Sequence, residues 1–112
     1  MLSRENRLHH SAEFSDVVRR GRRATRPLLT VHVLAGSPPP VRAGLVVSKA
    51  VGGSVVRSRV SRRLRHQLRE LVPVLPPDSR LVVRATPAAA TADSAALGAD
   101  LRRALNRLGI GG

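Results

Sequence analysis

The segment from Arg57 to Arg69 holds the residues of this chain whose types and spacing best suit chemistry. It contains six arginines and one histidine, namely Arg57, Arg59, Arg62, Arg63, Arg65, His66 and Arg69. Each guanidinium presents a planar fork of N–H donors that matches phosphate oxygens and can stack on a base. The segment therefore predicts binding of a nucleic-acid backbone rather than a covalent reaction.

An amphipathic helix from about Ser54 to Leu71 would position these cations. At about 100° per residue, an apolar side forms from Val56, Val60, Leu64, Leu68 and Leu71. The opposite side, called the arginine face below, consists of Arg59, Arg62, Arg65, His66 and Arg69. Arg57 and Arg63 flank the apolar side and can extend outward. We expect the apolar side to pack on a sheet.

The alternative is an ordinary solvated helix face. Such faces mix signs, with acids three or four residues from bases. Here Arg59 and Arg63, and again Arg65 and Arg69, are like-charge pairs at a spacing of four, and Glu70 is the one nearby acid. This pattern favours a surface that meets phosphates, although periodicity alone does not distinguish RNA from DNA.

The composition points to the same partner. The chain has 112 residues and a formal net charge of +13, from 20 basic and 7 acidic residues, and Lys49 is its one lysine. So large an excess repels itself, and a polyanion relieves the repulsion. The absence of cysteine excludes disulfides and thiolate metal sites, and no apolar run is long enough to span a bilayer. We expect a cytoplasmic protein that does not enter membranes.

Catalytic and metal-binding patterns are missing. The acids are scattered, with no pair of carboxylates placed to hold magnesium, and the histidines follow no ligand spacing. We therefore predict no catalytic residue, no metal site and no cofactor within this chain. The Gly52-Gly53 turn is equally compatible with a phosphate contact at the helix start and with a plain turn.

The remaining pattern predicts one α+β domain over residues 1–112. Helices are expected over Ala12–Arg20, capped by Ser11, and from a cap at Thr91 or Asp93 to about Leu108. Strands are expected over Leu28–Leu34, Arg42–Ser48 and Arg80–Arg84, with a further short strand near Thr25. The first two should form an antiparallel pair across the Ser37–Pro40 turn. We expect residues 1–10 to be a basic, flexible N-terminus and residues 109–112 a flexible C-terminus.

The run SKAVGGSVVRSRVSRRLR, from Ser48 to Arg65, resembles the signature of the bacterial ribonuclease P protein family. That signature has Ser-Lys, then a glycine, then Arg-Asn-Arg and further basic residues that open a helix. The matching positions are Lys49, Gly52, Val55, Arg57, Arg59, Arg62 and Arg65. The resemblance extends to RENRL at Arg4–Leu8, to the Phe14-to-Gly21 stretch and to the strand before Pro87.

The resemblance implies a two-layer fold in the order αβββαβα, with a small mixed sheet and a left-handed β-α-β crossover. It implies a subunit of ribonuclease P, an endoribonuclease that hydrolyses one phosphodiester to remove the 5′ leader of precursor tRNA. The catalytic centre and its magnesium ions would lie in the catalytic RNA. The implied partners are that RNA and precursor tRNA, and no protein partner is evident.

The resemblance also assigns roles to individual residues. The residues implied to bind the catalytic RNA are Lys49, Arg57, Ser58, Arg59, Arg62, Arg63, Arg65 and Arg69. Those implied to line a cleft for the leader are Phe14, Val18, Leu29 and His32. The sequence departs from the family where Ser58 replaces the central Asn, where Ser61 replaces a basic residue, and where Phe14 is the one aromatic residue left.

Three other functions remain open from sequence. A non-enzymatic ribosomal or general RNA-binding protein would share this composition. A DNA-binding helix would need a helix-turn-helix partner immediately upstream, where the chain instead predicts strand and turn. A polybasic membrane-surface protein would need an exposed apolar face for insertion.

Overall fold

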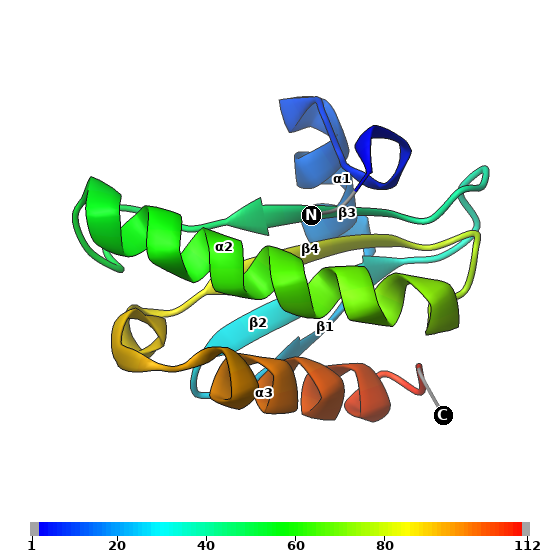
Figure 1. Ribbon diagram of the computed structural model, residues 1–112. Coiled ribbons are helices and arrows are strands. Elements are labelled where there is room, and N and C mark those ends of the chain that lie inside the picture. The colour runs from blue at the N-terminus through cyan, green and yellow to red at the C-terminus, as the bar shows by residue number, and fades with distance from the viewer. Residues whose placement is uncertain (1–2, 111–112) are drawn as a thin grey trace.

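The computed structural model describes residues 3–110 and forms an α+β sandwich in the predicted order αβββαβα (Figure 1). The helices are α1 (Ser11–Arg20), α2 (Ser54–Leu71) and α3 (Ser94–Arg107). The strands are β1 (Arg22–Thr25), β2 (Leu29–Leu34), β3 (Arg42–Val46) and β4 (Arg80–Ala85). Short 3-10 helices are η1 (Arg4–Asn6), η2 (Val72–Val74) and η3 (Pro87–Thr91). The short strand expected near Thr25 is β1.

The predicted antiparallel pair between the second and third strands is wrong. The sheet has the order β1-β2-β4-β3, so that β4 lies between β2 and β3, antiparallel to β2 and parallel to β3. The reason is that Leu81, Val82 and Val83 are all fully buried, on both faces of the sheet. A strand that is apolar on both faces needs a central position, and β4 takes it.

The loop from β2 to β3 therefore crosses the end of β4 instead of making a hairpin. It is tied there by polar contacts: the Ser37 N–H donates to the Asp78 carbonyl at 2.9 Å, and Arg80 donates to the carbonyls of Pro38 and Pro40 at 2.7 and 2.9 Å. These bonds satisfy carbonyls that the proline-rich turn cannot pair within a ladder.

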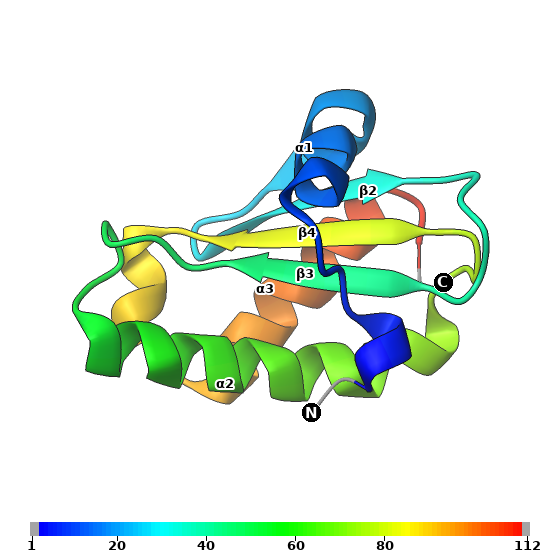
Figure 2. The ribbon, with the colours of Figure 1, turned by 90° about the horizontal axis from the view of Figure 1, so that it is seen from above.

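Helix α2 connects the parallel strands β3 and β4. Figures 1 and 2 together show that α2 returns on the face of the sheet that α3 also covers. Viewed from that face with the two parallel strands pointing up, β4 lies to the left of β3. The left-handed crossover is confirmed, against the strong right-handed preference of such units. Its consequence is that α2 runs along the β3 edge of the molecule.

The main core lies between the sheet and the two helices beneath it. From α2, Val60, Leu64 and Leu68 are fully buried there, as the helical wheel predicted. From α3, the apolar stripe of Leu97, Leu101, Leu105 and Leu108 is also buried. A smaller core on the opposite face contains Leu8, Val17 and Val82 beneath α1. The domain is thus a sheet covered on both faces, with α2 and α3 on one and α1 on the other (Figure 1).

Both chain ends are more ordered than predicted wherever they are described. The Leu8 N–H donates to the Ala43 carbonyl at 3.0 Å, and Leu8 is 7% exposed, so the N-terminal segment is bound to β3 at this point. At the other end, the Ile110 N–H donates to the Leu105 carbonyl at 2.9 Å past Gly109, whose φ is +77°. This is a Schellman closure of α3. The rest of the predicted flexible ends, residues 1–2 and 111–112, lies outside the described residues.

Two helix starts were predicted by side-chain caps. Asp93 caps α3 as expected, accepting the Ala96 N–H at 2.8 Å. Ser11 does not cap α1, because it is already the first helical residue and His10 is the N-cap. There the Glu13 carboxylate accepts the His10 N–H at 3.3 Å, which fixes the start of α1 from within the helix.

Replacement of Leu64 by alanine should destabilise the fold. Leu64 is fully buried in the middle of the α2 contact with the sheet, so the lost contacts and the cavity together should cost about 2–5 kcal/mol. Urea unfolding of the variant measures this cost. Arg62→Ala, on the exposed side of the same helix, is the matched control and should change stability by less than about 0.5 kcal/mol. Equal effects of the two changes would contradict this packing of α2.

Candidate RNA interface

The arginine face of α2 lies on the outer side of the helix, as predicted. Arg62, His66 and Arg69 are exposed, and Arg65 is half-buried. The apolar residues Val60 and Leu64 hold the opposite side against the sheet, so the direction of the face is set by the core. Ser58 is exposed on the same side, one turn before Arg62.

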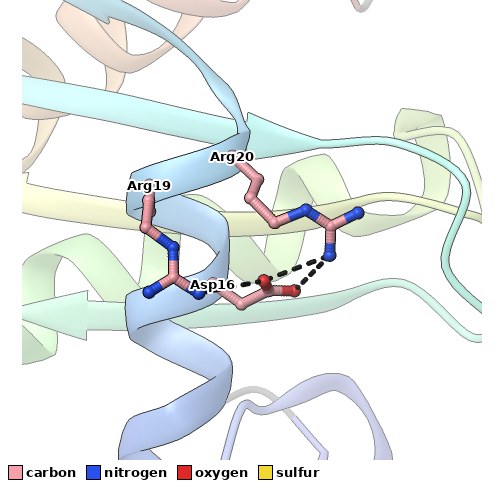
Figure 3. A network of polar contacts seen from close by, with 3 residues as sticks. All are labelled: Asp16, Arg19 and Arg20. Carbon is pink, nitrogen blue, oxygen red and sulfur yellow. Dashed lines mark hydrogen bonds and ion pairs between the residues drawn. The ribbon is translucent and has the colours of Figure 1, made fainter.

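The charges of this face are not neutralised by carboxylates. Among residues 3–110, no arginine of α2 lies within 4.0 Å of an acidic side chain, and Glu70 instead approaches His66 at 3.6 Å. Helix α1 shows the contrast (Figure 3): Asp16 accepts two hydrogen bonds from Arg20, at 3.1 and 3.2 Å, and lies 3.9 Å from Arg19. The six arginines of α2 thus form a row without carboxylate partners in the described part of the chain, whereas both arginines of α1 lie beside Asp16.

Two of the predicted RNA-binding arginines make contacts within the protein. Arg59 donates from Nη2 to the Ala90 carbonyl at 3.0 Å, and Arg63 donates from Nη1 to the Ala92 carbonyl at 2.6 Å. Both bonds hold the segment from η3 to α3 against α2. Carbonyls leave the positive charge in place, so Arg59 and Arg63 still contribute to the local potential, but their orientation is fixed.

The turn before α2 places Lys49 near the start of the arginine face. Lys49 is exposed, in the turn that leads to Gly52 and Gly53. Gly52 has a φ of +159°, and a Cβ there would lie 2.9 Å from side-chain atoms of Val56. The tight approach of the turn to the helix therefore accounts for glycine at this position. Gly53 is the N-cap of α2 and supplies no side-chain cap.

A hollow of about 300 Å³, called the α1 hollow below, opens between α1, the N-terminal segment, β3 and α2. It is lined by Arg7, Leu8, Phe14, Ala43, Gly44, Leu45, Ser61 and Arg65. Gly44 is required there because an added Cβ would collide with the Phe14 ring. Arg65 reaches this hollow from the arginine face and so joins the two predicted surfaces.

Sequence reasoning missed Arg7 and Ser61 as residues of the hollow. Arg7 belongs to the RENRL motif, which was noted as part of the resemblance but placed in a flexible tail. The signal that could have located it is Leu8, a lone apolar residue among polar neighbours that anchors the segment to the sheet. For Ser61 the wheel angle, close to that of Arg65 one turn later, is the available clue.

The predicted leader-cleft residues are brought together except for one. Phe14 and Val18 pack on the smaller core beneath α1. His32 lies on the same face of the sheet, paired across strands with Val82 of that core. The assignment of Leu29 to the leader cleft is wrong, because Leu29 is fully buried in the main core on the other face of the sheet. Because side chains alternate along a strand, Thr30 rather than Leu29 shares the face of His32.

His32 is nearly buried, with 5% of its surface exposed, and its Nδ1 has no hydrogen-bond partner. Burial lowers the pKa of His32 below its ordinary value of 6.5, and the nearby guanidinium groups of Arg84 and then Arg23 lower it further. The neutral imidazole is therefore the favoured form in the folded protein near neutral pH.

Two further results concern residues 3–110 as a whole. No three side chains of His, Asp or Glu gather there in a group that could hold a metal ion. No helix in this range combines the length and apolar character that crossing a bilayer requires.

A small α+β domain with an unneutralised row of arginines on one helix defines a basic nucleic-acid-binding protein. The family model described as Ribonuclease P matches residues 2–109. The ribonuclease P protein component of Streptomyces avermitilis is 56% identical, with 100% of this chain and 98% of the relative covered. That of a Nocardioides species is 53% identical, over 97% and 96%.

Solved structures agree in fold. The RNase P protein of Staphylococcus aureus superimposes with a TM-score of 0.85 at 18% identity, covering 96% of this chain and 98% of that one. The RNase P protein of Thermotoga maritima gives 0.76 at 20% identity, covering 87% and 92%.

The chain belongs to the ribonuclease P protein family. It is the protein subunit of the ribonucleoprotein that cleaves precursor tRNA, and the RNA of that ribonucleoprotein performs catalysis. The prediction of a ribonuclease P subunit is confirmed. The comparisons do not support the ribosomal, DNA-binding or membrane-surface alternatives.

The lowered pKa of His32 should make stability depend on pH. His32 binds a proton more readily in the unfolded chain than in the folded protein. The free energy of unfolding therefore has its full contribution from His32 above pH 6.5 and loses it as the pH falls below that value. Urea unfolding at about pH 7.5 and about pH 5.5 measures how much the free energy of unfolding falls between the two. The fall should be smaller for His32→Leu than for the unchanged protein. An identical loss in both proteins would rule out His32 as a source of the pH dependence.

Proposed function

We propose that α2 binds the phosphates of the catalytic RNA through its arginine face, with Lys49, Arg57, Ser58 and Arg63 at its border. The observation that carries this proposal is the row of arginines without acidic partners on a helix whose other side is locked into the core. Binding of such a face releases counterions from RNA and relieves the repulsion among the arginines.

The roles within this set differ. Arg62 and Arg69 are exposed and free to follow the RNA backbone. Arg59 and Arg63 each donate one hydrogen bond to a carbonyl of the η3–α3 connection, which fixes the direction of their remaining N–H donors. Ser58 offers a hydroxyl where the family has an amide, so it makes fewer hydrogen bonds to RNA.

The face beneath α1 is proposed to hold the single-stranded 5′ leader of precursor tRNA. Phe14 is exposed enough in the α1 hollow to contact a base, and Arg7 and Arg65 lie at the same hollow to meet phosphates. Val18 and Thr30, which are half-buried, extend this surface across the sheet, and the nearly buried His32 lies beneath it. Unpaired bases are the part of RNA that side chains read most readily.

The protein would then act by charge neutralisation and by positioning the precursor against the RNA active centre. We propose that the magnesium ions of the holoenzyme are held by the RNA, and that assembly takes place in the cytoplasm, where precursor tRNA is made. No side chain of this protein is assigned a catalytic step.

Paired substitutions test the arginine face. Arg62→Ala with Arg69→Ala should weaken binding to the cognate catalytic RNA and lower the salt dependence by about two phosphate contacts. Filter binding over a series of salt concentrations measures the slope. Arg22→Ala with Arg107→Ala removes the same charge from exposed positions away from α2 and should change the slope less. Equal slopes for the two double variants would refute the assignment.

Reconstitution tests the proposed role of the α1 hollow. Adding the protein to its catalytic RNA should raise cleavage of precursor tRNA at low magnesium and should favour leader-bearing precursor over mature tRNA in binding. Phe14→Ala should reduce that preference by about fivefold to tenfold, since one stacked base is lost.

The same variant should bind the catalytic RNA alone as tightly as the unchanged protein, because Phe14 does not belong to the arginine face. If Phe14→Ala retained the full preference for leader-bearing precursor, the leader would have to lie elsewhere on the protein.

A further inference from the structure

Val55 is an apolar side chain in a place where the core cannot use it. It is 78% exposed in the first turn of α2, and Val74, at 59%, is the one other exposed large apolar side chain among the described residues. Its neighbour Val56 turns toward the main core. Exposure of single apolar residues is common, so the surroundings of Val55 decide whether it has a role.

Those surroundings form a shallow depression of about 350 Å³ at the amino-terminal half of α2, open to solvent and bounded by side chains of this helix alone. It is lined by Ser54, Val55, Ser58, Arg59 and Arg62, and is called the Val55 hollow below. One wall is apolar, two residues carry hydroxyl groups and two carry guanidinium groups. The Arg59 wall is held in place by its bond to the Ala90 carbonyl at 3.0 Å.

The charge around this hollow selects the occupant. Two arginines and no acidic side chain line it. The electrostatic attraction is therefore stronger for a polyanion than for an acidic or neutral protein segment. A phosphate alone would not use Val55, because it has no apolar surface. An unpaired nucleobase has both an apolar face and a polar edge, and its backbone brings the phosphate for the arginines.

We propose that the Val55 hollow receives one unpaired nucleobase of the catalytic RNA, with Val55 against the face of the base. Ser54 and Ser58 donate hydrogen bonds to the edge of the base, and Arg62 contacts the adjoining phosphate. This site rests on the proposed binding of the catalytic RNA by α2, and it adds a contact that reads RNA structure rather than charge. Val55 thereby limits binding to an RNA that presents an extruded base at this place.

Val55→Ser separates this contact from electrostatics. Serine and valine have similar helix propensities, so α2 should remain intact, and thermal unfolding verifies that it does. Binding to the cognate catalytic RNA should weaken about tenfold at every salt concentration, with an unchanged salt slope, because no charge is removed. Val55→Leu keeps an apolar side chain and should restore most of the affinity.

Val74→Ser is the matched control, since it removes the other exposed valine without touching α2. It should bind as the unchanged protein does. Chemical probing of the catalytic RNA should reveal a base that the unchanged protein and Val74→Ser protect and that Val55→Ser leaves reactive.

The outcomes separate this inference from the function on which it rests. If the unchanged protein fails to bind the catalytic RNA, the proposed function itself is wrong. If it binds, but Val55→Ser matches Val74→Ser in affinity and in protection, the nucleobase site is wrong and the arginine face is unaffected. A steeper or shallower salt slope for Val55→Ser would also refute the site, because it would show an effect on phosphate contacts.

Discussion

The packing of one side of α2 on the sheet is the interaction on which the proposed RNA-binding surface depends. Val60, Leu64 and Leu68 are fully buried, one turn apart, and they leave the helix no freedom to rotate about its axis. The direction of every arginine on α2 follows from that constraint. Packing in the core thus orients the arginines of α2, and no hydrogen bond to a carboxylate is needed for this. Their positive charge therefore stays available for the proposed contact with RNA.

The central position of β4 has an equally direct effect on function. Because β4 is apolar on both faces, it separates β2 from β3 and makes β3 an edge strand, and the left-handed crossover carries α2 along that edge. The N-terminal segment closes against the same strand through Leu8 and Ala43. Helix α1 and α2 are therefore neighbours across β3, and Arg65 and Phe14 share the α1 hollow although the chain separates them widely. The two surfaces proposed to contact RNA become continuous for this reason.

Patterns of period 3.6 and period 2 were enough to predict the helices, the strands and the apolar side of α2, because these depend on neighbouring residues. Strand order was not accessible in this way: the pairing of Arg42–Val46 with β4 depends on which strand is buried on both faces, which is a property of the whole sheet. Leu29 was misassigned because the family resemblance, and not the strand pattern, placed it with His32. The alternation of Leu29, Val31 and Val33 with Thr30 and His32 puts Leu29 on the opposite face. The bonds of Arg59 and Arg63 to carbonyls near α3 were also hidden, because their acceptors lie about thirty residues away and carry no side-chain signature.

The repulsion within the arginine face is compatible with a stable helix on simple magnitudes. Each like-charge pair at a spacing of four costs about 0.2–0.5 kcal/mol, so the two arginine pairs of α2 at this spacing together cost about 0.4–1 kcal/mol. Burial of one leucine or valine side chain contributes about 1.5–3 kcal/mol, and α2 buries three completely. The bonds of Arg59 and Arg63 to carbonyls offset part of the remaining cost. The buried side of α2 therefore outweighs the repulsion among its arginines, so the exposed charges of Arg62 and Arg69 can change without loss of the helix that carries them.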